Sequence, residues 1–212
     1  MKFSSFFLLF LIWAAAPLKS QPVMHEQNIF PLQDKHVHGS SIVACPNGDL
    51  LACWFHGSGE RTADDVLIQG ARFKKGAKKW SPVFIMADTP GFPDCNPALF
   101  IDQKNRLWIF WIAVLAHRWE KSLLMYRIAE HYQKDGAPDW TWQGVINLKP
   151  GKKFAETLEK GMKKLFPEEP MWAEYAPPYP RLLVQAAQDP AKRQMGWMTR
   201  LHPTVLPSGR IL

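Results

Sequence analysis

The sequence predicts an all-β fold: the start of a β-propeller, incomplete in this chain, with a helical insertion near 152–166. Three observations predict it. A hairpin signal occurs three times, the first two hairpins are each followed by two more strand-like runs, and aromatic residues are abundant. The chain has 212 residues, including ten Trp and thirteen Phe. Such side chains suit the half-buried surfaces of sheets.

Each hairpin signal is a turn sequence between two apolar runs. The turns lie at Asn47-Gly48, at 103–105 and at 207–209. The residues that follow them, Leu50, Leu107 and Ile211, are 57 and 104 positions apart. The first spacing is close to the length of a propeller blade. The second is longer because it contains the insertion.

Further strand-like runs complete the first two units. They occupy 66–73 and 80–85 after the first hairpin, and 122–127 and 140–148 after the second. Four strands per unit is the number in a propeller blade. We therefore expect the N-terminal part of one propeller domain over 36–212. Because the chain stops inside the third hairpin, we expect it to be a piece of a longer protein.

The insertion covers about 150–195. Within it, Phe154, Leu158, Met162 and Leu165 follow helical spacing, with lysines on the other face, and Pro167 ends the pattern. We expect this helix to pack on the side of the propeller. A helix lying on a membrane surface is the alternative.

The first 21 residues have the features of a signal peptide. Lys2 supplies the positive end, and an unbroken apolar run covers 6–16, which is too short to span a bilayer. Cleavage is expected at Ala14–Ala16 or near Ser20-Gln21. The sequence thus predicts a secreted or periplasmic protein with no stable membrane insertion once the signal is removed.

The three cysteines predict thiols rather than a disulfide framework. An odd number leaves at least one unpaired. Cys45 and Cys53 flank the first turn, and a two-residue turn at Asn47-Gly48 would place Cys45 opposite Leu50. We therefore expect buried free thiols.

The net charge of +7 favours anionic partners, but the basic residues are scattered, so no nucleic-acid partner is predicted.

Short segments of the chain resemble a known family. They are 47–55 with 57–65, Arg72 and Trp80–Pro82, then 96–100 with 107–111, and finally 202–206 with 208–212. Their order and spacing resemble the sialidase-like (BNR-repeat, predicted neuraminidase) proteins. The resemblance implies a β-propeller, an exported carbohydrate-active protein, and an exo-acting glycosidase.

Two motifs of that family are altered. Its Asp-box, Ser-x-Asp-x-Gly-x-Thr-Trp, is reduced to Trp80 and a displaced Gly76. Its Arg-Ile-Pro motif, whose Arg binds the carboxylate of sialic acid, is replaced by Asn28–Leu32, which contains no Arg. The second change counts against sialic acid as the sugar and leaves the fold prediction unaffected.

Polar residues gather at one predicted rim of the propeller. The resemblance implies that ligands bind at the rim formed by the starts of the first strands and the loops after the second strands. The polar residues expected there are His38, His56, Glu60, Arg61, Asp64, Asp65, Asp94, Asn96, His117, Arg118, Glu120 and His202.

Asp65 is the first catalytic candidate, because glycoside cleavage needs a carboxyl group that delivers a proton to the leaving oxygen. A loop-capping role is its structural alternative, and Asp64 is the adjacent rival. His38 and His202, each at the start of a first strand, are candidates for acid/base catalysis or for contacts to sugar hydroxyls. They are otherwise structural histidines.

Substrate binding is assigned to Arg61, Asp64, Asn96 and Arg118. Either Arg can hold a substrate carboxylate through two hydrogen bonds; otherwise each is a surface residue. No metal site is expected, since the sequence has no Cys-x-x-Cys pattern and its only His-x-His pattern is His36-Val-His38. No cofactor is expected.

The leading prediction is a sialidase-like glycoside hydrolase that cleaves a terminal acidic sugar from a glycan or oligosaccharide. Two alternatives stay open: a glycan-binding propeller without catalysis, and a lyase in which a His or Tyr abstracts the proton α to a uronate carboxylate. Glu174-Tyr175 does not match the family's Tyr/Glu nucleophile pair. We expect that pair beyond Leu212.

Overall fold

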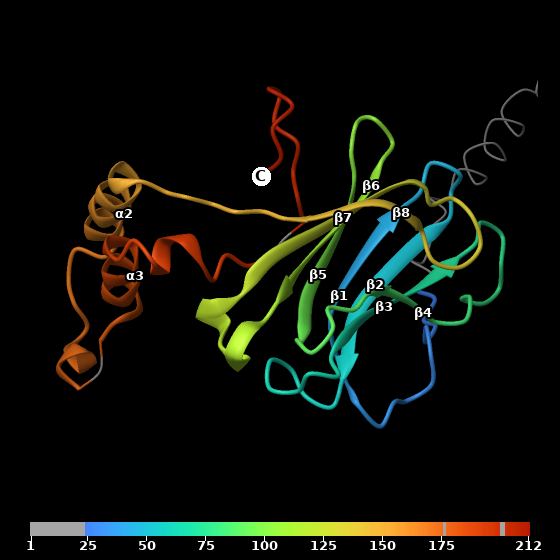
Figure 1. Ribbon diagram of the computed structural model, residues 1–212, viewed down its shortest axis with the longest axis horizontal. Helices are drawn as coiled ribbons and strands as arrows, with labels where there is room; N and C mark the ends of the chain where they lie inside the picture. Colours follow the sequence, from blue (N-terminus) through green and yellow to red (C-terminus); the bar gives the residue numbers. More distant parts are fainter. Residues whose placement is uncertain (1–23, 176, 200–201) are drawn as a thin grey trace, which may run out of the picture.

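A computed structural model describes residues 24–175, 177–199 and 202–212 of the protein (Figure 1). The predicted signal peptide lies outside these residues. The described chain forms two four-stranded antiparallel sheets and two α-helices. The predicted all-β architecture and the four strands per unit are confirmed.

The first sheet contains β1 (His36–Ala44), β2 (Leu50–Gly57), β3 (Leu67–Phe73) and β4 (Phe84–Ala87). The second contains β5 (Asp94–Ile101), β6 (Leu107–Ala113), β7 (Leu123–His131) and β8 (Asp139–Val145). The helices are α2 (Lys152–Leu165) and α3 (Tyr179–Gln188). Short 3₁₀ turns cover Leu115–His117, Trp119–Lys121, Met171–Glu174 and Lys192–Gln194.

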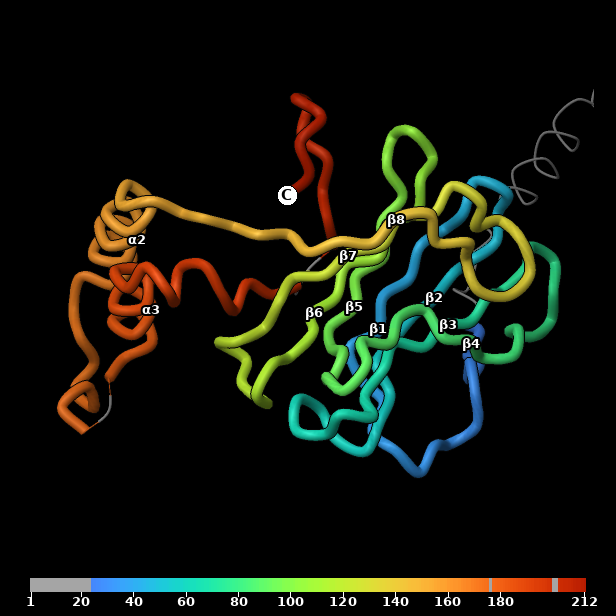
Figure 2. Tube along the Cα trace, in the orientation of Figure 1, coloured from blue at the N-terminus to red at the C-terminus, as the bar shows by residue number. Residues whose placement is uncertain are grey.

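The strands of each sheet follow one another in chain order, and each pairs with the next. The two sheets lie against each other through β5, which contacts β1, β2 and β3 (Figure 2). Two such units side by side have the arrangement of neighbouring propeller blades. The described residues form no closed ring, so the complete propeller remains a prediction.

The first hairpin has a three-residue loop rather than the two-residue turn that the sequence predicted. The Cys45 N–H donates to the Asp49 carbonyl (2.7 Å), and the Gly48 N–H donates to the Cys45 carbonyl (2.8 Å). Cys45 therefore faces Asp49, and Leu50 pairs with Ala44. The expected register was wrong by one residue, because Gly48 adopts a φ of 89° and forms a bulge after the turn.

The same loop occurs in all three hairpins. Asn105 (φ 57°) and Gly209 (φ 79°) occupy the position of Gly48. In the third hairpin, however, the expected strands are reduced to a single bridge between Val205 and Ile211. A hairpin without a further strand beside it is only marginally stable.

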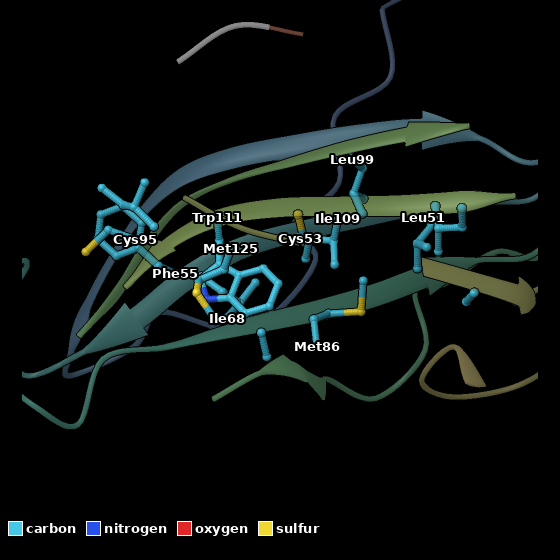
Figure 3. Close-up of a cluster of buried hydrophobic side chains, with 14 of the residues drawn as sticks. Leu51, Cys53, Phe55, Ile68, Met86, Cys95, Leu99, Ile109, Trp111 and Met125 are labelled. Carbon is cyan, nitrogen blue, oxygen red and sulfur yellow. The ribbon is translucent and has the colours of Figure 1, made fainter. Parts of the chain in front are cut away.

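The main core lies between the two sheets (Figure 3). Leu51, Phe55 and Ile68 of the first sheet pack against Leu99 and Trp111 of the second, and all five are fully buried. Burying one such side chain contributes about 1.5–3 kcal/mol. This cluster holds the two sheets together.

All three cysteines are buried free thiols, as predicted. Cys53 and Cys95 belong to the core between the sheets. Burial raises the pKa of the Cys95 thiol to about 12, so this thiol stays protonated and unreactive at neutral pH.

The outer faces of the two sheets are covered differently. On the first sheet, Phe30 lies over the buried Trp54, with ring centroids 4.7 Å apart. On the second, Phe100 and Phe110 form a smaller cluster to which Val205 adds partial cover.

The predicted helix near 152–166 is present as α2. The sequence did not predict α3, because 176–180 contains three prolines. The helix nevertheless begins at Tyr179, with Pro180 in its first turn, where proline is tolerated. The expected packing of α2 on the side of the sheets is wrong. It packs on α3, and Figure 1 places the pair beside the sheets. No helix in the described part of the chain is long and apolar enough to cross a membrane.

Candidate functional site

Three of the predicted site residues meet in one pocket. His38 comes from β1, Asn96 from β5, and His202 from the segment before the third hairpin. The pocket has a volume of about 390 Å³. We call it the inner-strand pocket; its lining residues are His38, Gly39, Ser40, Ser41, Ile42, Asn96, Pro97, Ala98, Thr199 and His202.

A bulge in each first strand shapes this pocket. The pairing register shifts between His38 and Ser41 in β1, and between Cys95 and Ala98 in β5. Gly39 (φ 62°) and Asn96 (φ 51°) occupy the corresponding bulge positions. Glycine and asparagine are the residues that tolerate positive φ. A bulge bends its strand and turns side chains in new directions, and here it turns Asn96 toward the pocket.

Two hydrogen bonds tie the walls of the pocket together. The Leu99 N–H donates to Ser41 Oγ at 3.0 Å, which joins β5 to β1. The Thr199 hydroxyl donates to the Asn96 carbonyl, which joins the third segment to β5. Sequence reasoning had assigned no role to Ser41 or Thr199. Thr199 precedes its hairpin loop by the same number of residues as His38 does, a signal that was available.

His38 and His202 are not equivalent positions. When the three hairpin loops are matched, His202 corresponds to Ser41 and Ala98, whereas His38 corresponds to Cys95. The two histidines therefore line the pocket from different positions along their segments. His38 is exposed and lies edge-on to Phe55, with ring centroids 5.6 Å apart.

The other predicted catalytic and substrate-binding residues lie on two loops at the end of the sheets where β2 stops; they are Arg61, Asp64, Asp65 and Arg118. We call residues 58–65 and 115–121 the rim loops. His117 Nε2 lies 2.8 Å from Asp64 Oδ1, which links one loop to the other. The two rim loops are therefore in contact through this pair.

Asp65 has the partners of a loop cap. Its carboxylate accepts hydrogen bonds from Lys35 Nζ (2.7 Å), Ser58 Oγ (2.6 Å) and the Ser58 N–H (2.9 Å). The hydrogen bond from Lys35 is the main reason that the pKa of this carboxyl lies well below its usual range, and those from Ser58 add to it. In this arrangement Asp65 is ionised at neutral pH and holds no proton to donate.

The two candidate arginines lie apart from Asp65's carboxylate network. Arg61 is not among the hydrogen-bond partners of Asp65 in the described residues, and it lies over the ring of Trp119, with its guanidinium carbon 5.4 Å from the centroid. Arg118 Nη1 lies 3.8 Å from Glu120 Oε1, and the Arg118 side chain is largely exposed. Both retain donors that a substrate carboxylate can use.

Asp94, one of the polar residues expected at the rim, is a buried carboxyl. It is fully buried, and it accepts hydrogen bonds from Trp111 Nε1 (2.8 Å) and the Thr89 N–H (2.7 Å). Burial raises its pKa to about 6, against the lowering effect of those hydrogen bonds. Only the tertiary structure could reveal this, because no local pattern marks the burial of an Asp at the start of a strand.

The polar groups of the inner-strand pocket suit the hydroxyl groups of a sugar. Imidazole, amide and hydroxyl groups line it beside Ile42, Pro97 and Ala98, a mixture that can hydrogen-bond sugar hydroxyls and pack against a sugar ring. In the described residues, no group of three or more His, Cys, Asp or Glu could hold a metal ion.

Residues 48–167 match the family model described as a BNR repeat-like domain. This match covers more than half of the chain. The chain belongs to the BNR repeat-like family. The sialidase-like resemblance is thereby confirmed at the level of the family. A comparison with curated proteins found no match.

The matched region of this BNR repeat-like chain contains both sheets from the first hairpin loop onward. It includes the rim loops and Asn96, but His38 and His202 lie outside it. The inner-strand pocket therefore combines residues inside the matched region with residues on both sides of it.

Proposed function

We propose that this BNR repeat-like protein binds the terminal, acidic sugar of a glycan at the inner-strand pocket and hydrolyses the glycosidic bond next to it. The observation that carries the proposal is the convergence of His38, Asn96 and His202 on one pocket. Imidazole and amide groups hydrogen-bond sugar hydroxyls, and the rim-loop arginines supply cations for the sugar's carboxylate.

Hydrolysis needs a proton donor, and Asp65 is the proposed one. Its present contact with Lys35 opposes that role, because a nearby cation favours the ionised carboxylate. A substrate carboxylate that draws Lys35 away, and that covers Asp65, would raise its pKa toward the range of a general acid. The proposal thus includes exchange of this ion pair on substrate binding.

A uronate-linkage lyase is the second candidate. It is favoured by the lining of the pocket, in which two histidines occur and no carboxyl group does. One His would abstract the proton α to the uronate carboxylate, and the bonding electrons would form the C=C bond as the glycosidic oxygen leaves. Such a reaction would not use Asp65.

Product analysis separates these functions. The full chain would be incubated with oligosaccharides that end in an acidic sugar, and products would be followed by ultraviolet absorbance and by reducing ends. Reducing ends without absorbance support hydrolysis, and an absorbing unsaturated product supports the lyase. Binding without either product would show recognition alone and refute catalysis by this chain.

Two variants of neighbouring carboxylates test whether Asp65 is the proton donor. Asp65→Asn should lower turnover about 100-fold, the usual contribution of a general acid, while Asp64→Asn is the matched control and should have a much smaller effect. Thermal melting confirms that both fold. Turnover of Asp65→Asn at the parent rate would rule out the assignment. His202→Ala should weaken binding to the same oligosaccharides.

The proposed location is outside the cytoplasm, secreted or periplasmic. The support is the apolar run of 6–16 behind Lys2. Mass spectrometry of the protein recovered from its own cells should find an N-terminus between residues 15 and 22. An intact Met1 on a cytoplasmic chain would contradict export.

A further inference from the structure

A second crevice lies at the opposite end of the sheets from the rim loops. It is formed by the β3–β4 loop of the first sheet and the β7–β8 loop of the second, and its volume is about 460 Å³. It shares no lining residue with the inner-strand pocket. The residues that line it and carry the argument are Arg72, Lys74, Lys79, Trp80, Ser81 and Asp135.

Arg72 is a buried cation at this crevice with an unused donor. Its side chain is 1% exposed, and it donates to the Tyr132 carbonyl and to Cys45 Sγ. Its Nε–H has no partner among the described residues. Arg72 Nη1 forms an ion pair with Asp49 Oδ2 at 3.6 Å, and the Asp49 carboxylate also accepts hydrogen bonds from the Lys75 backbone N–H and from Asn47 Nδ2. A buried donor left unpaired is costly, which favours an added acceptor.

The lysines add to this positive charge. Lys74 pairs with Asp135 across the crevice. Lys79 is exposed and makes no ion pair in the described part of the chain. Since Arg72 pairs with Asp49 and Lys74 with Asp135, the excess positive charge of the crevice comes from Lys79.

An aromatic ring lies beside these cations. Trp80 is half-buried and packs on Phe73, with ring centroids 5.4 Å apart. Aromatic side chains present an apolar surface to the faces of sugar rings, and cations bind carboxylate or sulfate groups. Ring and cations in one crevice fit a ligand that carries both features.

We propose that this crevice is an accessory binding site for an acidic sugar unit. The carboxylate or sulfate group contacts Lys79 and Arg72, and the sugar ring packs on Trp80. The site rests on the proposed function only in that its ligand is a glycan. It takes no part in bond cleavage, and it holds a second region of an acidic polysaccharide.

Three tetrasaccharide probes test the ligand class by calorimetry on the full chain. Chondroitin 4-sulfate carries sulfate and carboxylate, hyaluronan carries carboxylate alone, and cellotetraose is neutral. We expect both acidic probes to bind at least tenfold more tightly than the neutral one. Binding of chondroitin sulfate alone identifies sulfate as the required group. Equal binding of all three, or binding of none, overturns the proposal.

Three variants test the location. Trp80→Leu and Lys79→Ala should each weaken binding of the acidic probes about five- to tenfold, the range for losing one ring or charge contact. Lys78→Ala is the matched control, because Lys78 is an exposed neighbour that does not line the crevice; it should change affinity less than twofold. Thermal melting would verify that Trp80→Leu folds.

Binding of the acidic probes at the crevice should not depend on the inner-strand pocket. His202→Ala should leave binding at the crevice unchanged, even if it abolishes turnover. Loss of acidic-probe binding in His202→Ala, with none in the Trp80 and Lys79 variants, would place the probes in the inner-strand pocket and overturn the accessory site. An equal loss in Lys78→Ala would indicate a general basic surface and would overturn it as well.

Discussion

The first sheet has Gly39 in its bulge and Gly48 in its hairpin loop, whereas the second has Asn96 and Asn105 at the corresponding places, all four with positive φ. The backbone thus repeats although the residues differ. A Cβ at Gly39 would lie 2.8 Å from the Phe55 ring, while Asn96 faces the inner-strand pocket. The backbone needs a residue that tolerates positive φ, and the surroundings decide whether that residue can have a side chain.

The outer faces of the two sheets differ in how far their tryptophans are covered. Trp54 of the first sheet is buried beneath Phe30. On the second sheet, Trp142 is 60% exposed and donates from Nε1 to the Tyr126 hydroxyl. The ring of Trp54 is therefore packed on one sheet, whereas most of the ring of Trp142 lies open to solvent on the other.

The largest expected effect contrasts these two tryptophans. Trp54→Ala should lower the free energy of unfolding by about 3–5 kcal/mol, because it leaves a cavity in a packed face. Trp142→Ala should cost less than about 1 kcal/mol, since most of that ring is already in water. Urea denaturation of both variants measures the contrast. Equal losses would mean that the two faces are covered alike.

A second contrast concerns Asp94, which carries a titrating carboxyl group. Its counterpart in the first sheet is Val37, which has none. The folded-state pKa of Asp94, about 6, exceeds its ordinary value of 3.8. Its contribution to stability is therefore fully present below pH 4 and is lost as the pH rises to about 6, by up to about 3 kcal/mol.

Asp94→Asn isolates this contribution, because it removes the titrating group while other carboxyls remain. Asp65 works in the opposite direction: its lowered pKa adds stability above pH 4 that is lost on acidification. The difference in unfolding free energy between parent and Asp94→Asn should change between pH 4 and pH 7. A constant difference would mean that Asp94 titrates normally.

The bulges provide a smaller contrast. Gly39→Ala should cost about 1–3 kcal/mol, because the new Cβ meets Phe55 at an unfavourable φ. Asn96→Gly should change stability by less than about 1 kcal/mol, since glycine adopts the same φ freely. Thermal melting gives both values. A stable Gly39→Ala variant would show that β1 can relax its bulge.

The hairpin loops provide the smallest expected contrast. Gly48→Asn should cost less than about 1 kcal/mol: Asn105 shows that asparagine fits this loop, and the contact at Gly48 is the flexible end of Lys75. Asn105→Gly should be neutral within about 0.5 kcal/mol. Chemical denaturation of the pair measures this. A large loss in either would mean that side-chain contacts, and not φ alone, hold the loop.

Local sequence predicted the repeating parts well. The hairpin loops and α2 depend on residues three or four positions apart, so turn composition and apolar spacing locate them. The register of the first hairpin was missed because Asn47-Gly48 also suits a two-residue turn. Only the bond from Cys45 N–H to the Asp49 carbonyl distinguishes the two loops.

The sequence by itself determined the family, the four strands of each unit, the buried thiols and the polar character of the rim loops. The tertiary structure decided which of those residues meet. Lys35 reaches Asp65 across 30 positions, and His38, Asn96 and His202 converge from three segments. The physical reason is that strand composition specifies a strand, whereas bulges, register and sheet-to-sheet packing decide which distant side chains face one another, and burial then sets the pKa of a group such as Asp94.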